Sequence, residues 1–330
     1  MCFMFKRLSA SFTQILLTLL SLYLTYLLLR YPTQALDYAS TGLLLWFRKM
    51  IPTLLPFMIL SGIMVRLNLT ERFARCFHPL FHMIWGTSIN GSYVILMGML
   101  CGFPMGARVI GELICAGKLS EEEGAYLLSF CNNIGPIYFI SFVMSTLSLS
   151  GNYLPFLIMY GVPLLYGFLY GRLITIKKKI LHKNEFATNF SSLPIHAASV
   201  FAPDRVSLLT AIDDSIISGL IGIGKLGGYM VFFNLLNIMM LPFSTLPNLF
   251  LAFCNCILEI TSGINRVGSS GFYMILCLLP FGGLSCMAQT YSMIKGTNLS
   301  ISRYFLHKCI QSIITFVIYF FFFFSSAYNF

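Results

Sequence analysis

Charged side chains are scarce in this sequence of 330 residues, and acidic ones are the scarcest. Only 10% of the residues are charged, and 11 Asp and Glu stand against 21 Lys and Arg, which gives a formal net charge of +10. An ordinary soluble domain carries about 25% charged residues. With 57% hydrophobic residues and a mean hydropathy of +0.81, the chain cannot cover a water-facing surface with polar groups. The composition also excludes disordered, fibrous and disulfide-rich secreted proteins.

The sequence also lacks the motifs of common catalytic and nucleotide-binding sites. It contains no Walker motif, no Gly-x-Ser-x-Gly and no dinucleotide fingerprint. The ten cysteines are scattered, and the close pair Cys254 and Cys256 lacks the spacing of a zinc site. We therefore expect no enzyme activity, no metal site and no cofactor. The basic residues lie at the ends of apolar runs rather than on one soluble face, which argues against nucleic acid as a partner.

What the chain does have is a series of long apolar runs. The first, residues 8–29, is about 22 residues long, enough to cross the roughly 30 Å of a hydrocarbon core. It is too long for a signal peptide and lacks a small-residue cleavage site, so we expect a retained helix with Lys6 and Arg7 in the cytoplasm. The sequence predicts an all-α, multi-pass membrane protein, with the lipid bilayer as a partner and about 8 to 10 spans.

Several of the other apolar runs are short and stop at glycine and proline. Breaks occur at residues 102–106, 132–136 and 280–283, and a shift of 180 residues places Gly102 on Gly282. Short, interrupted segments in corresponding positions of two halves indicate a transporter binding site. We therefore predict two pseudo-symmetric repeats with re-entrant hairpins and broken helices. The expected organisation is an N-terminal transmembrane helix (1–30), a first repeat (31–176), a basic cytoplasmic linker (177–205) and a second repeat (206–330).

Two charged residues follow the first break. Arg108 and Glu112 lie four apart, on one helix face. Ionisable residues inside a membrane are costly and usually functional. The half-helix beginning near Met105 has its positive end at the break, so Arg108 could complete a pocket for a carboxylate. The alternative is that Arg108 pairs with Glu112 and only holds the hairpin together.

Polar residues at the other breaks also have two interpretations each. The amides of Asn132 and Asn133 either bind ligand or cap the freed backbone. Glu259 could bind a coupling proton or cation, or pair with Lys225 or Arg266. The predicted substrate-binding set comprises residues at or beside the breaks: Gly102, Pro104, Gly106, Arg108, Glu112, Asn132, Asn133, Glu259, Thr261, Ser285 and Gln289.

These breaks carry motifs that resemble a known family. The motifs are GFPMGAR at 102–108, SFCNNIGP at 129–136, LEITSG at 258–263 and FGGLSCMAQ at 281–289. In sequence and in order they are similar to the YlbJ family of sporulation integral membrane proteins, and the resemblance covers most of the chain from about Arg48 onward. One departure is Arg108, where the family carries lysine; the charge is kept, but the geometry of its hydrogen bonds changes.

The resemblance implies a fold and a role. The family is grouped with nucleoside-recognition, or Gate, domain proteins, so both repeats are expected to be Gate-like and inverted relative to each other. The implied role is in endospore formation, moving a small anionic substrate, dipicolinic acid, out of the mother cell toward the forespore, in the membrane around the forespore. Two rival interpretations are a scaffold that does not transport and an intramembrane enzyme acting on a lipid-linked precursor. Assembly as a homo-oligomer or with sporulation membrane partners stays open.

Overall fold

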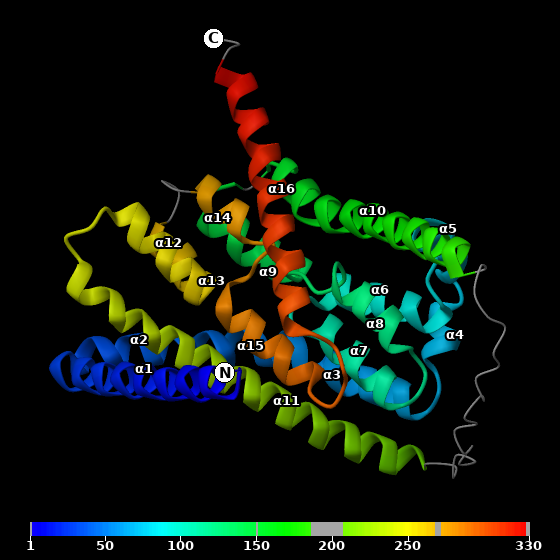
Figure 1. The fold of residues 1–330 in the computed structure, drawn as a ribbon, viewed down its shortest axis with the longest axis horizontal. Coiled ribbons are helices and arrows are strands. Elements are labelled where there is room, and N and C mark those ends of the chain that lie inside the picture. The colour runs from blue at the N-terminus through cyan, green and yellow to red at the C-terminus, as the bar shows by residue number, and fades with distance from the viewer. Residues whose placement is uncertain (1, 150, 186–206, 268–271, 328–330) are drawn as a thin grey trace.

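The computed structural model describes residues 2–149, 151–185, 207–267 and 272–327, and about 83% of these residues are helical. The helices follow one another along the chain in Figure 1. They are α1 (Cys2–Arg30), α2 (Pro32–Leu45), η1 (Trp46–Met50), α3 (Ile51–Arg66), α4 (Thr70–Ala74), α5 (His78–Trp85), α6 (Ile89–Cys101), α7 (Met105–Cys115), α8 (Glu121–Leu128), α9 (Pro136–Tyr138), η2 (Phe139–Met144), α10 (Leu154–Glu185), α11 (Leu208–Leu236), η3 (Asn237–Phe243), α12 (Asn248–Leu258), α13 (Ile260–Val267), α14 (Phe272–Leu278), α15 (Gly283–Ile294) and α16 (Ile301–Ala327).

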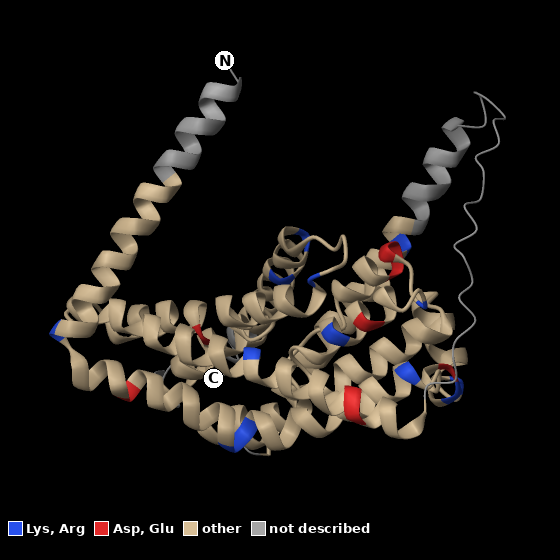
Figure 2. Cartoon of the chain, turned by 90° about the horizontal axis from the view of Figure 1, so that it is seen from below, with Lys and Arg blue, Asp and Glu red and all other residues tan. Residues whose placement is uncertain are grey.

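Six helical segments in the described ranges are long and apolar enough to cross a membrane. They are residues 13–30, 32–66, 154–174, 208–243, 272–294 and 301–322. A seventh results if α5 and α6, which meet at 94°, count as one broken span. Figure 2 shows how few charged residues the helices carry. An all-α, multi-pass membrane protein is therefore confirmed. The span count is lower than the sequence suggested because α7, α8, α12 and α13 are each too short to cross alone.

The start of α8 shows how local sequence sets these boundaries. Ser120 is its N-cap, and its Oγ accepts a hydrogen bond from Glu123 N at 3.2 Å. In a capping box the Glu123 carboxylate would return to the N-cap backbone. Here Glu123 Oε1 instead accepts from Ser88 N at 2.7 Å, and Ser88 is the N-cap of α6. One carboxylate therefore ties together the starting ends of two short helices.

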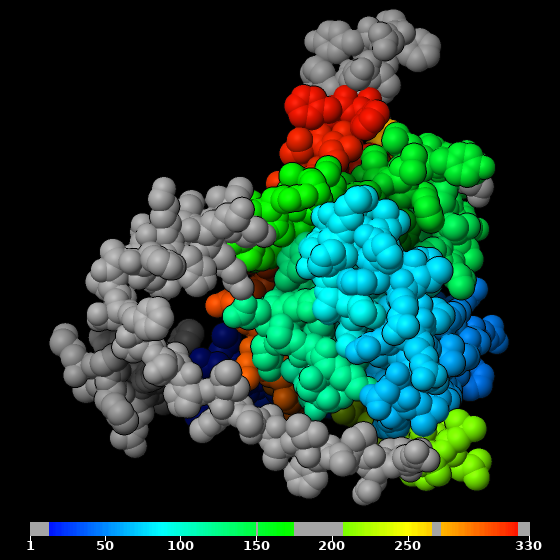
Figure 3. All heavy atoms as spheres, turned by 90° about the vertical axis from the view of Figure 1, so that its right-hand side faces the viewer, coloured from blue at the N-terminus to red at the C-terminus, as the bar shows by residue number. Residues whose placement is uncertain are grey.

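Helices from the two parts of the sequence interleave. The helix α11 packs mainly on α2 and α3, α15 packs on α7, and α16 packs on α10. The last of these, α16, crosses the molecule in red in Figure 1. The helices α5 and α10 lie next to each other on the face shown in Figure 3. This interleaving places α7 directly against α15, and the buried residues of both interrupted parts share one core.

The expected linker falls mostly outside the described residues. Residues 177–185, its first part, are helical and continue α10, whereas 186–205 lie outside the described ranges. The proposed domain limits and the relation between the two repeats stay predictions.

Candidate functional site

Four interruptions of the helices meet in the interior. In chain order, the first lies between α6 and α7, the second between α8 and α9, the third at Glu259 between α12 and α13, and the fourth between α14 and α15. A Cβ on Gly102, between α6 and α7, would overlap the backbone nitrogen of Gly135, in the segment between α8 and α9. A Cβ on Gly282, between α14 and α15, would lie 3.1 Å from Cε2 of Phe103. Both glycines have positive φ, +82° and +75°, which favours glycine further. Freed backbone groups at membrane depth are tolerated only against protein or water, and here the breaks pack on one another.

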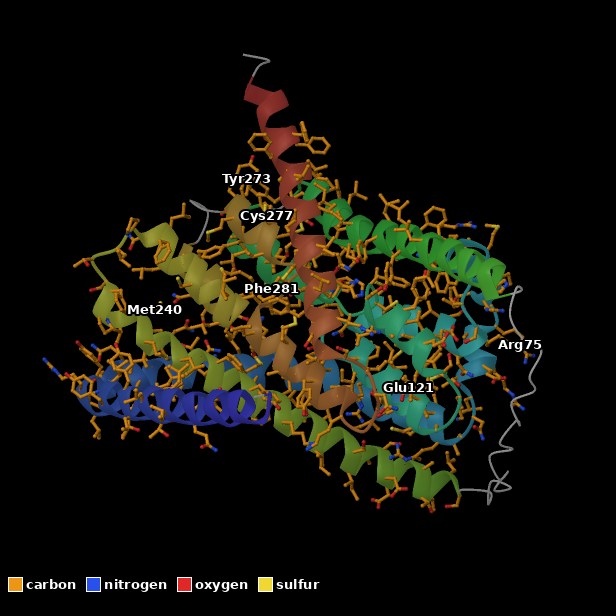
Figure 4. The ribbon with its side chains drawn as sticks, viewed as in Figure 1. Arg75, Glu121, Met240, Tyr273, Cys277 and Phe281 are labelled. Atoms are coloured by element: carbon orange, nitrogen blue, oxygen red, sulfur yellow. The ribbon has the colours of Figure 1, made fainter. Side chains whose placement is uncertain are left out.

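A small cavity of about 80 Å³ lies at this meeting point. Three residues of the predicted set line it, namely Glu259, Thr261 and Gln289. Most of the wall is apolar, and it includes Phe103 and Ile134 from the first two breaks. Figure 4 labels Phe281, near the middle of the molecule, which marks the fourth break. The cavity therefore combines an apolar wall with a few polar groups, the usual make-up of a small-molecule site.

Glu259 is a buried carboxylate held by neutral donors. It is 3% exposed and has extended backbone between α12 and α13. Its oxygens accept from Thr261 Oγ1 at 2.8 Å and from Ser262 N at 2.9 Å. Among the described side chains no Lys or Arg forms an ion pair with Glu259. The pairing with Lys225 is not formed, and the side chain of Arg266 lies outside the described residues.

A hydrogen bond of Thr261, two residues after Glu259, connects this segment to the first part of the chain. Thr261 Oγ1 also accepts from Tyr138 OH, in α9, at 3.1 Å. Gln289 Nε2 donates to Ser285 Oγ, one turn earlier in α15, at 3.0 Å. Ser285 itself is fully buried and does not line the cavity.

The two asparagines of the second break mainly satisfy other protein groups. Asn132 Oδ1 accepts from Ala107 N at 3.3 Å, at the N-terminal end of α7. Asn132 Nδ2 donates to Thr290 Oγ1 and to Tyr304 OH, both at 2.9 Å. Asn133 Nδ2 donates to Phe130 O at 2.6 Å. Of the two interpretations left open, backbone capping is the one these contacts support, because the positive end of α7 already faces an amide oxygen.

A buried lysine, absent from the predicted set, contacts Asn133. Lys308 in α16 is 0% exposed, and its Nζ donates to Asn133 Oδ1 at 2.6 Å and to Gln311 Oε1 at 3.2 Å. Its ammonium also lies over two aromatic rings, 5.4 Å from the Phe103 centroid and 5.7 Å from that of Tyr304. No carboxylate in the described part of the chain forms an ion pair with it.

Arg108 lies elsewhere and has a counter-ion. It is 4% exposed, and its Nε donates to Glu112 Oε1 at 2.8 Å. Its guanidinium also donates to Ser218 in α11, to the hydroxyl at 3.0 Å and to the carbonyl at 3.4 Å. Neither Arg108 nor Glu112 lines the small cavity. The ion pair that the spacing allowed is therefore present, and a role of Arg108 in anion binding stays a prediction.

The remaining predicted residues shape the backbone around the first break. A Cβ on Gly106 would lie 2.5 Å from Cys131 O, so only glycine lets α7 approach the second break this closely. Pro104 precedes α7, and its carbonyl accepts the Arg108 N–H at 3.0 Å. These contacts assign both residues to the architecture of the site.

A larger cavity of about 780 Å³ lies between α8, α10 and the start of α16. Its lining is rich in charged and polar groups, including Glu121, Arg303 and His307, and Glu121 is labelled in Figure 4. Ser129 and Tyr304 also line it. Ser129 O accepts from Gln311 Nε2 at 2.6 Å, so this cavity borders the side chains that hold Lys308.

The sequence contains a signal that could have identified Lys308 as a candidate site residue. This residue is a lysine inside the apolar run 304–324, and an intramembrane cation is a functional-site signal. Its partners could not be found in this way, because Asn133 precedes it by 175 residues.

Comparison with known proteins agrees with the motifs. The chain is 23% identical to the sporulation integral membrane protein YlbJ of Bacillus subtilis (strain 168), over an alignment of 325 residues that covers 88% of this chain and 78% of the relative. No protein-family model and no solved structure matches the chain. The similarity confirms the resemblance to the YlbJ family and supports a sporulation membrane protein. The relation to Gate-domain proteins stays a prediction.

Proposed function

We propose that this protein is a sporulation-associated membrane transporter of a small anionic metabolite, and that dipicolinic acid, moved from the mother cell toward the forespore, is its substrate. The likeness to a sporulation integral membrane protein supports the setting. One observation carries the transport role: Lys308 and Glu259 are both buried and have no ion-pair partner among the described residues. Glu259 lies at a helix break, and Lys308, in α16, contacts Phe103 and Asn133 of two other breaks.

The cost of burying charge is the physical reason. An unpaired ion inside a protein or a membrane is strongly unfavourable, so such groups persist where they pair with a ligand or an ion. A protein that served only as a scaffold would gain nothing from two such charges in its core. A carrier needs them, because an anionic substrate supplies the missing partner of a buried cation and a proton or cation supplies that of a carboxylate.

The positions of the two cavities also support movement of a substrate past the Lys308 region. Two side chains that contact the Lys308 ammonium line the cavities, Tyr304 the larger one and Phe103 the smaller one, whereas Lys308 itself lines neither. Discontinuous helices at such a position are typical of secondary transporters. Dipicolinate is a small, planar dianion, so its charge is opposite to that of the buried Lys308.

Uptake by reconstituted protein tests this function. The purified protein is inserted into liposomes that contain Tb³⁺, whose luminescence rises when it binds dipicolinate. After dipicolinate is added outside, we expect luminescence to rise faster in these vesicles than in protein-free liposomes. An excess of acetate outside should leave this rate unchanged. Equal rates with and without protein, together with a stable co-purifying partner from sporulating cells, would reject transport and support the scaffold interpretation.

A further inference from the structure

We propose that Lys308 binds a carboxylate of the substrate and that one of two aromatic rings, that of Phe103 or that of Tyr304 according to the side of approach, contacts its planar body, so that the site selects aromatic acids over aliphatic ones. This inference rests on the proposed transport function and assigns its binding residue.

The first step is the charge balance around Lys308. An ammonium group has three N–H donors. Two of them are directed to amide oxygens, those of Asn133 and Gln311, and both acceptors are neutral. The aromatic rings beneath it add a cation–π attraction but carry no negative charge. The protein therefore leaves the positive charge of Lys308 without a negative partner, and a substrate carboxylate supplies one.

The second step is the shape of the surroundings. The Lys308 ammonium lies over the Phe103 ring and over the Tyr304 ring. Tyr304 lines the larger cavity, and Phe103 lines the smaller one. An aromatic acid whose carboxylate reaches Lys308 can therefore place its ring against one of these two side chains on either approach. Offset or edge-to-face contacts between aromatic rings add to the binding.

The third step separates binding from a purely structural role. Lys308 also holds Asn133, so it could serve only to shape the second break. Asn133→Asp places a carboxylate where the amide oxygen lies 2.6 Å from Nζ, and Asn133→Leu is its control, because both substitutions remove the hydrogen bond from Nδ2 to Phe130 O and only the aspartate adds a charge. Asn133→Leu should therefore keep its affinity for dipicolinate. A structural Lys308 would be held at least as well by the aspartate. A substrate-binding Lys308 would lose its affinity for an external anion.

Equilibrium dialysis of the full-length protein in detergent, with radiolabelled dipicolinate, measures the effect. We expect Asn133→Asp and Lys308→Met each to raise the Kd at least about 30-fold, as loss of a buried charge partner does. Asn152→Asp is the matched control, since Asn152 is exposed and its Oδ1 accepts from Leu154 N at 3.0 Å, which an aspartate oxygen also does. Its Kd should match that of the unchanged protein.

The outcomes separate the two proposals. If either variant folds and binds dipicolinate like the unchanged protein, Lys308 is not the binding residue, whereas transport by the unchanged protein still supports the proposed function. If the unchanged protein neither binds nor transports dipicolinate, the proposed function itself fails. Competition by glutarate, which has two carboxylates and no ring, should be about fivefold weaker than competition by unlabelled dipicolinate. Equal competition would overturn the aromatic selectivity.

Discussion

Arg108 and Lys308 are both cations buried in apolar helices, yet they differ in what surrounds them. Arg108 has a carboxylate four residues along its own helix, at 2.8 Å. Lys308 has only neutral amides and aromatic rings, from segments far away in the sequence. The comparison teaches that an intramembrane charge alone does not locate a substrate site. Whether the protein already supplies the opposite charge is the more informative property.

The two arrangements also differ in when they can form. A pair on one helix exists as soon as that helix does, so Arg108 and Glu112 can enter the membrane as a neutral unit. The contacts of Lys308 require α16, the first break and the second break together. The site around Lys308 therefore depends on the complete fold, and variants that disturb the breaks should affect it more than they affect the Arg108–Glu112 pair.

The largest expected effect comes from Gly102→Ala. A Cβ at this position would overlap the backbone nitrogen of Gly135, so it pushes apart the two breaks that hold Phe103 and Asn133 against Lys308. Gly117→Ala is the matched control, because Gly117 also has positive φ, +68°, but a Cβ there would meet no other atom within 4 Å. We expect the control to lose about 1 kcal/mol from its backbone alone.

Gly102→Ala should lose about 3 kcal/mol more than that control, because its backbone, with φ +82° and ψ −168°, is accessible essentially to glycine alone and because the surrounding backbone has to move. Thermal unfolding in detergent measures both variants. Equal Tm values for the two would show that the breaks do not pack as closely as described. They would also remove the structural support for the Lys308 site.

Much of the local structure could be predicted from the sequence. The helix start at Ser120 follows from its capping pattern, the Arg108–Glu112 pair from its spacing, and the interruptions at Gly102 and Gly282 from their glycines. These features depend on residues within a few positions of one another. The sequence pattern also identified the membrane class, because apolar length is a property of each segment by itself.

The arrangement of the site could not be predicted in the same way. Asn132 was expected to bind ligand or cap backbone, and its partners Thr290 and Tyr304 lie more than 150 residues away. Arg108 was placed at the break by its position in the chain, but the rotation of α7 directs it to Ser218 in α11. Which face of a short helix meets which neighbour is decided by tertiary packing, and periodicity does not contain that information.

An intermediate effect is expected from Glu112→Gln, which leaves Arg108 buried without its counter-ion. Breaking a buried pair is strongly destabilising, but the Glu112 side chain is 22% exposed, so we expect a loss of about 2 kcal/mol. Replacing Arg108 by Met in the same protein should recover most of that loss. Thermal unfolding gives the stability, and dialysis gives the affinity for dipicolinate, which should change less than about twofold. A large loss of affinity in the double variant would instead assign anion binding to Arg108.

The smallest effect is expected from Phe103→Leu, which keeps an apolar side chain against Gly282 but removes the ring beneath the Lys308 ammonium. We expect a loss of about 1 kcal/mol in affinity, or roughly fivefold in Kd, because the cation–π contact and the stacking surface both disappear. Phe316→Leu, at a side chain that is 55% exposed, is the control and should bind dipicolinate normally. If Phe103→Leu binds dipicolinate unchanged while Lys308→Met does not, the site recognises the carboxylate alone. Its preference for planar acids would then have to arise from the width of the cavity.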